Sequence, residues 1–97
     1  MPKYAKTDDN HALIVSALRR VGAQVASLAS IGRGMPDLLV AFRGKWHVAE
    51  VKSGKKFYKG HKELSPQEEV WHETFGQQAR VQIWHDVEEA MKGIGAM

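Results

Sequence analysis

The chain has 97 residues, close to the usual size of one domain, about 100–200 residues. Hydrophobic residues make up 43% of it, but no apolar run approaches the roughly 18 residues of a membrane-spanning helix. The lack of cysteine excludes disulfides, thiolate nucleophiles and cysteine-based zinc sites. A net charge of +3 permits a polyanionic partner without requiring one. No signal-peptide pattern is visible, so we expect a cytoplasmic protein.

The first predicted element is a helix over about Asp8–Val21, where apolar residues recur at helical spacing. Thr7 or Asp8 is suited to cap its start, and Gly22 is suited to end it. The residues expected on its apolar face are Leu13, Ile14, Ala17, Leu18 and Val21. A short strand is predicted at Gln24–Leu28, and a glycine-containing irregular loop follows.

Two further strands, Asp37–Arg43 and Trp46–Ser53, are predicted to form a hairpin joined at Gly44-Lys45. The stretch Leu38–Phe42 is apolar without alternation, which is typical of a strand covered on both faces. Helices should therefore flank the sheet. A polar, lysine-rich loop follows the hairpin.

A second helix is predicted from Ser65, which forms a capping-box pattern with Glu68, and Pro66 suits the first helical position. The residues expected on its inner face are Val70, Trp71, Thr74 and Phe75. A strand at Arg80–Trp84 and a last helix from Asp86 complete the order helix, three strands, helix, strand, helix. The sequence thus predicts a single α/β domain over residues 1–97, with a mixed central sheet flanked by helices.

The predicted hairpin brings three reactive side chains together. With Gly44-Lys45 as a two-residue turn, Asp37 lies opposite Lys52 and Leu39 lies opposite Glu50. Asp37, Glu50 and Lys52 then share a face, because side chains on a strand repeat every second residue. Asp37 is diagonal to Glu50 at about 7–8 Å, from which two carboxylates can converge on one hard cation.

Two explanations for this polar set among apolar strand residues remain open. Burying ionised groups is costly unless they are paired or coordinate a metal, so an Asp37–Lys52 or Glu50–Lys52 ion pair is one explanation. A Mg²⁺ site is the other. It accounts better for two acids beside one base, because a buried ion pair adds little stability over an apolar replacement.

The order Gly34-Met35-Pro36-Asp37, twelve intervening residues, then Glu50-Val51-Lys52 resembles the PD-(D/E)xK nuclease signature. Its spacing and apolar flanks resemble the VRR-NUC branch, especially the small stand-alone phage members. Similar segments cover nearly the whole chain: 10–22 at the first helix, 64–71 at the second and 81–90 in the tail. The resemblance implies a restriction-endonuclease-like core and a bacterial or phage-infected host cell.

The resemblance also implies a metal-dependent DNA endonuclease. Asp37 and Glu50 would hold Mg²⁺ or Mn²⁺ together with the backbone carbonyl of Val51 and waters. Lys52 would orient the attacking water and neutralise charge on the phosphate. Stand-alone members resemble dimeric Holliday-junction resolvases, so a homodimer acting on branched DNA is expected. The alternative is a DNA-binding or assembly module that keeps the fold without cleaving.

Each further candidate has a structural alternative. Asn10 stands where related nucleases often carry an acid, and it either supports the site or caps the helix. Glu68 either reaches the site or serves only its capping box, and Arg33 contacts a phosphate or lies in solvent. The lysines expected to contact the DNA backbone are Lys55, Lys56, Lys59 and Lys62. The five histidines show no paired metal-ligand spacing, and the three tryptophans are expected in the core or a dimer interface.

Overall fold

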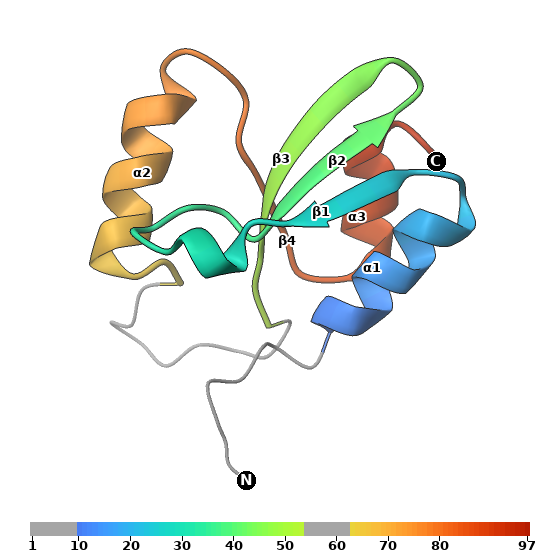
Figure 1. Ribbon diagram of the computed structural model, residues 1–97, viewed down its shortest axis with the longest axis horizontal. Coiled ribbons are helices and arrows are strands. Elements are labelled where there is room, and N and C mark those ends of the chain that lie inside the picture. Colours follow the sequence, from blue (N-terminus) through green and yellow to red (C-terminus); the bar gives the residue numbers. More distant parts are fainter. Residues whose placement is uncertain (1–9, 54–62) are drawn as a thin grey trace, which may run out of the picture.

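The structure, a computed structural model, describes residues 10–53 and 63–97. The elements are α1 (His11–Arg20), β1 (Gln24–Ser27), the 3₁₀ helix η1 (Ala29–Ile31), β2 (Leu38–Phe42), β3 (Lys45–Val51), α2 (Pro66–Gly76), β4 (Gln82–Trp84) and α3 (Val87–Ile94). The predicted order of helices and strands is confirmed (Figure 1). Within the described ranges, no helix is long and apolar enough to cross a membrane.

The four strands form one mixed sheet in the order β1-β2-β3-β4. Strand β2 pairs antiparallel with both β1 and β3, whereas β3 and β4 are parallel. A parallel pair needs a crossover connection, and the chain segment that contains α2 provides it. The expected α/β class with a mixed sheet is therefore confirmed.

The predicted hairpin register is wrong by two residues. Phe42 pairs with Lys45, so the turn residues are Arg43 and Gly44 rather than Gly44 and Lys45. Arg43 and Gly44 have φ values of 51° and 83°, and two positive φ angles are what a type I′ turn requires. Since a shift of two residues preserves the side-chain alternation, the sharing of a face by the site residues survives this error.

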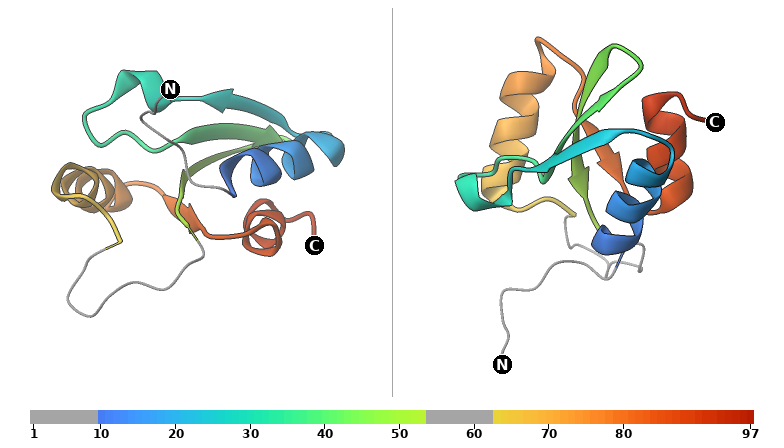
Figure 2. Two further views of the ribbon diagram at one scale, coloured as in Figure 1. Left: turned by 90° about the horizontal axis from the view of Figure 1, so that it is seen from below. Right: turned by 45° about the vertical axis from the view of Figure 1, so that its right-hand side comes forward.

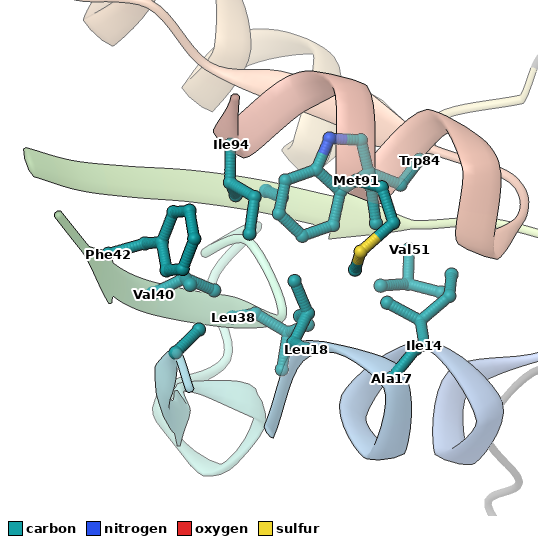
Figure 3. Close-up of a cluster of buried hydrophobic side chains, with 13 residues drawn as sticks. Ile14, Ala17, Leu18, Leu38, Val40, Phe42, Val51, Trp84, Met91 and Ile94 are labelled. Atoms are coloured by element: carbon teal, nitrogen blue, oxygen red, sulfur yellow. The ribbon is translucent and has the colours of Figure 1, made fainter. Parts of the chain in front are cut away.

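One face of the sheet carries the apolar core. Helices α1 and α3 lie side by side against this face (Figure 2). The core residues come from both helices and from the strands between them (Figure 3): Ile14, Ala17, Leu18, Leu38, Val40, Phe42, Ala49, Val51, Trp84, Ala90, Met91 and Ile94. The expectation that Leu13 and Val21 belong to the buried face of α1 is wrong, because they are 65% and 43% exposed.

Strand β4 buries a polar residue beside an aromatic one. Gln82 and Trp84 are buried, and Ile83 between them is half-buried. The indole N–H of Trp84 donates to Gln82 Oε1 at 2.9 Å, which satisfies two polar groups in the core. Trp84 is therefore a core residue as expected, whereas Trp46 on β3 is 72% exposed and is not.

Helix α2 begins as predicted but packs differently. Ser65 accepts a hydrogen bond from the Glu68 N–H, the Glu68 side chain returns one to the Ser65 N–H, and Pro66 opens the helix. None of its residues is buried, however, and Val70 and Phe75 are 63% and 51% exposed. The expected inner apolar face is thus wrong. The helix lies apart from α1 and α3, at the left of Figure 1.

Candidate functional site

Asp37 and Glu50 meet where β2 begins and β3 approaches its end. The pairing of Leu38 with Ala49 places Asp37 directly across from Glu50, not diagonal to it as the predicted register implied. Asp37 Oδ2 accepts a hydrogen bond from the Val51 N–H at 2.8 Å, and a hydrogen bond also joins the Asp37 and Glu50 side chains. Ala49 and Val51 point into the core, so Glu50 faces the other side of the sheet.

The Glu50 carboxyl has an unusual electrostatic environment. It is only 1% exposed, and burial together with the hydrogen bond and charge of Asp37 raises its pKa to about 9. The charge of Glu68 acts in the same direction, while Lys52 opposes it. Without a cation, Glu50 therefore keeps its proton at neutral pH. The site holds more carboxyl groups than its own cationic side chain can neutralise.

Lys52 follows β3 directly and pairs with the second helix. Its Nζ donates to Glu68 Oε1 at 2.9 Å, and both side chains are about one-fifth exposed. Burial lowers the pKa of Lys52, but the hydrogen bond and charge of Glu68 outweigh this and raise it. Glu68 therefore both closes the capping box and reaches the site. The sequence alone left these two roles as alternatives.

His72 is a site residue that the sequence analysis missed. Its Nε2 lies 3.3 Å from Glu50 Oε1, and its side chain is 12% exposed. Burial and the charge of Lys52 lower the pKa of His72, so the ring is neutral at neutral pH. A signal was present in the sequence: His72 follows Glu68 by four residues on a helix, so the two side chains share a face. This signal is a spacing between a glutamate and a histidine, so the spacing of the histidines alone does not reveal it.

Asn10 supports the backbone of the site. Its side-chain N–H groups donate to the Lys52 carbonyl at 2.8 Å and to the His85 carbonyl, which ties α1 to the ends of β3 and β4. As N-cap residue of α1, Asn10 makes no side-chain capping bond. Its Oδ1 is buried without a hydrogen-bond partner among the described residues. Asn10 therefore supports the backbone at Lys52 rather than capping the helix through its side chain, and its role in a metal site stays a prediction.

The loop between β1 and β2 is pressed against α2. The Leu28 N–H donates to the Asp37 carbonyl at 2.8 Å and closes the loop. Gly34 has φ +81°, and a Cβ added to it would lie 2.3 Å from the Gln67 carbonyl oxygen. This close approach needs glycine. The preceding residue, Arg33, also has a positive φ of 59° and projects an exposed side chain near the same helix.

The donor chemistry of the site fits a hard divalent cation. Asp37 and Glu50 supply oxygen ligands, and Mg²⁺ is commonly held by one or two carboxylates with water in the remaining positions. The added positive charge would also relieve the repulsion that keeps Glu50 protonated. No group of three or more His, Asp or Glu side chains in residues 10–53 and 63–97 is arranged as a full metal cage.

Some of the predicted site residues lie beyond this description. Lys55, Lys56, Lys59 and Lys62 fall outside the described residues, so their expected DNA contacts stay predictions. The Val51 N–H contacts Asp37, while the role expected of the Val51 carbonyl oxygen stays a prediction.

Comparison with known proteins adds no family to this picture. Neither protein-family models, curated proteins nor solved structures gave a match to the chain.

Proposed function

We propose that the protein is a Mg²⁺- or Mn²⁺-dependent endonuclease that hydrolyses DNA phosphodiester bonds. The observation that carries the proposal is the meeting of Asp37, Glu50 and Lys52 on the face of the sheet opposite the apolar core. Burying an acidic pair there is costly without a cation, and a structural role alone does not require it. The order of these residues, which resembles the PD-(D/E)xK signature, supports the same conclusion.

In this proposal, Asp37 and Glu50 hold the cation, and His72 fixes the Glu50 carboxyl by contact at 3.3 Å. The cation supplies Lewis-acid polarisation of the phosphoryl group and positive charge against the charge that develops during hydrolysis. Lys52 is held by Glu68 at 2.9 Å, so its ammonium is directed before substrate binds. It orients the attacking water and stabilises the phosphate oxygens. The water oxygen bonds to phosphorus as the bond to the leaving sugar oxygen breaks, the water gives up a proton to solvent, and the leaving oxygen takes up a proton from solvent.

The substrate and assembly are part of the same proposal. We infer branched or otherwise structured DNA, such as a Holliday junction, and a homodimer with two sites. The resemblance to dimeric Holliday-junction resolvases supports the dimer. The net charge of +3 supports a polyanionic substrate. A cytoplasmic location in a bacterial or phage-infected cell follows from the resemblance.

Cleavage assays test the proposal. Supercoiled plasmid and a four-way junction are incubated with purified protein in Mg²⁺, Mn²⁺ or EDTA. We expect cutting only with the divalent ions, and a loss of at least about 100-fold in Lys52→Ala, the scale on which one transition-state donor acts. Lys45→Ala removes an exposed lysine of the hairpin and is the matched control. Cutting in EDTA, or unchanged cutting by Lys52→Ala, contradicts the mechanism.

One observation favours a second candidate function. Lys52 already has a carboxylate partner in Glu68, which is also what a purely structural ion-pair cluster in a DNA-binding or assembly module would show. Titration calorimetry separates the two. An enzyme site predicts that Mn²⁺ binds wild type more tightly than Asp37→Ala, whereas the structural cluster predicts no difference.

A further inference from the structure

A shallow groove of about 400 Å³ runs along α2 next to the candidate site. Its main feature is a stacked aromatic pair, Trp71 and Phe75, whose ring centroids are 4.0 Å apart with an interplanar angle of 9°. Phe75 is 51% exposed, so the stack offers a ring surface to solvent. Pro66, Val70 and Thr74 extend the wall, and Arg33 lies at the rim.

The groove and the two α2 side chains that contact the site lie on neighbouring faces of the same helix. Glu68 and His72 point from α2 to Lys52 and Glu50, and the Trp71 ring lies 6.0 Å from the His72 ring in an edge-on arrangement. The Gly34–Gln67 contact holds the loop against α2 and brings Arg33 to the same place. A molecule in the groove would therefore lie directly beside the acidic pair.

The lining selects one kind of occupant. Among the described residues that line the groove, Arg33 is the only one with a charged side chain, and the rest of this lining is mainly apolar and aromatic. A nucleotide matches both parts, since its base has a flat π-face and its phosphate carries the charge that complements a guanidinium. A purely apolar partner surface would leave the guanidinium without a counter-charge.

We propose that this groove binds an unpaired nucleotide of the DNA substrate, with its base on the Trp71–Phe75 stack and its phosphate at Arg33. The inference rests on the proposed nuclease function and narrows the substrate to DNA with single-stranded nucleotides beside the scissile bond. Duplex bases do not expose their faces, so a base must leave its stack to enter. Flaps, gaps and opened junctions supply such bases.

DNA-binding measurements in EDTA test this inference under conditions in which no cleavage is expected. Fluorescein-labelled oligothymidylate, an abasic strand of equal length and a blunt duplex are titrated with protein, and anisotropy is measured. Phe75→Leu keeps an apolar side chain but removes the ring face, and we expect about tenfold weaker binding of oligothymidylate. Trp46→Leu removes an aromatic side chain that is 72% exposed on β3, and as the matched control it leaves binding unchanged. Wild type should bind the abasic strand as weakly as Phe75→Leu binds oligothymidylate.

The phosphate contact has its own variant. Arg33→Gln should weaken binding and reduce the slope of log K against log salt by about 0.7, the value for one phosphate of a single strand. Arg43→Gln is the matched control, because Arg43 is also an exposed arginine with positive φ but lies in the hairpin turn. Equal effects of the two arginine variants would overturn the phosphate assignment.

The outcomes separate this inference from the proposed function. The nucleotide assignment is wrong if Phe75→Leu binds oligothymidylate as tightly as wild type does. It is also wrong if wild type binds the abasic strand as tightly as oligothymidylate. Suppose instead that light scattering finds Phe75→Leu to be a monomer and wild type a dimer, while the affinity for single strands is unchanged. The groove is then an interface between copies of the chain, and the nucleotide assignment is wrong. If Phe75→Leu loses single-strand binding while Lys52→Ala still cuts DNA, the groove stands and the catalytic proposal fails.

Discussion

At the scale of single residues, Glu50 carries the largest electrostatic cost in the described structure. A carboxyl whose pKa is raised on folding binds its proton more tightly in the folded state. In metal-free protein its contribution to stability is therefore present below the ordinary pKa of 4.5 and is lost as pH rises toward about 9. The free energy of unfolding of the metal-free protein should therefore fall between these pH values because of Glu50 alone.

Glu50→Gln removes the titration and tests this account. At pH 8 in EDTA we expect the variant to be about 1–3 kcal/mol more stable than wild type, because wild-type Glu50 must take up a proton on folding at that pH, whereas a neutral amide need not. Near pH 4.5 the difference should largely disappear, since there Glu50 also holds much of its proton in the unfolded chain. Urea denaturation at several pH values measures it. Glu88→Gln is the control, because the Glu88 side chain is 63% exposed on α3, and a similar pH trend in that variant would refute the assignment to Glu50.

Substitutions at two nearby glycines distinguish the cost of backbone strain from the cost of a steric clash. A Cβ on Gly32 meets nothing within 4 Å, so Gly32→Ala should cost only the backbone strain of its φ of 72° and ψ of −157°, about 1–3 kcal/mol. A Cβ on Gly34 collides with the Gln67 carbonyl, so Gly34→Ala should cost more and displace the loop from α2. Urea denaturation gives the stabilities, and Mn²⁺ calorimetry should find weakened binding only in Gly34→Ala. Equal costs in both would mean that the contact with α2 is unimportant.

At the scale of elements, α2 and α3 share the same kind of cap but not the same kind of packing. Ser65 and Asp86 each accept a backbone N–H three residues on. Helix α3 buries Ala90, Met91 and Ile94, whereas α2 buries nothing and touches the sheet side through polar contacts such as Lys52–Glu68. Removal of the cap should therefore destabilise different parts of the molecule in the two helices.

Removing each cap should cost about 1 kcal/mol. For Ser65→Ala we expect faster hydrogen exchange confined to residues 66–76, because this helix can open without disturbing the core. For Asp86→Ala we expect faster exchange also in β2 and α1, because α3 is part of the core. Exchange measured by NMR or mass spectrometry distinguishes these patterns, and global acceleration in Ser65→Ala would show that α2 is coupled to the core after all.

The elements also mark what the sequence could predict. Capping chemistry and periodicity are local, so the helix that starts at Ser65 and the order of helices and strands followed directly from the residues. The hairpin turn did not, because an arginine with φ 51° is an uncommon first residue of a type I′ turn. The apolar pattern of α2 was misassigned for another reason. Hydrophobic spacing indicates which side chains share a face, but not whether that face meets the core.

The residues of the site also divide into those that the sequence could predict and those that it could not. Asp37, Glu50 and Lys52 were predictable because a hairpin brings them together over a short sequence distance. His72 was not, since its contact with Glu50 spans 22 residues and depends on where α2 settles. Asn10 is similar: its bond to the Lys52 carbonyl joins residues 42 apart. Contacts of that range are properties of the tertiary fold.

At the scale of the whole molecule, the apolar core and the Asp37–Glu50 pair lie on opposite faces of one sheet. Leu18 is fully buried in the α1 side of the core, while Leu13 on the same helix is 65% exposed. Leu18→Ala should cost about 2–5 kcal/mol in unfolding free energy, and Leu13→Ala should cost close to nothing. Neither should alter Mn²⁺ affinity under conditions where the protein is folded, as calorimetry can establish. A parallel loss of affinity in Leu18→Ala would mean that the faces are coupled.

The position of α2 has an evolutionary consequence. A helix that buries none of its residues contributes little to the folding of the rest, so the side chains along its outside are exempt from the constraint that fixes a core. Mutations there can accumulate without unfolding the chain, provided that Glu68 and His72 keep their contacts. Substitutions along the outside of α2 can thus change this surface while the Asp37–Glu50 pair and the fold stay as they are.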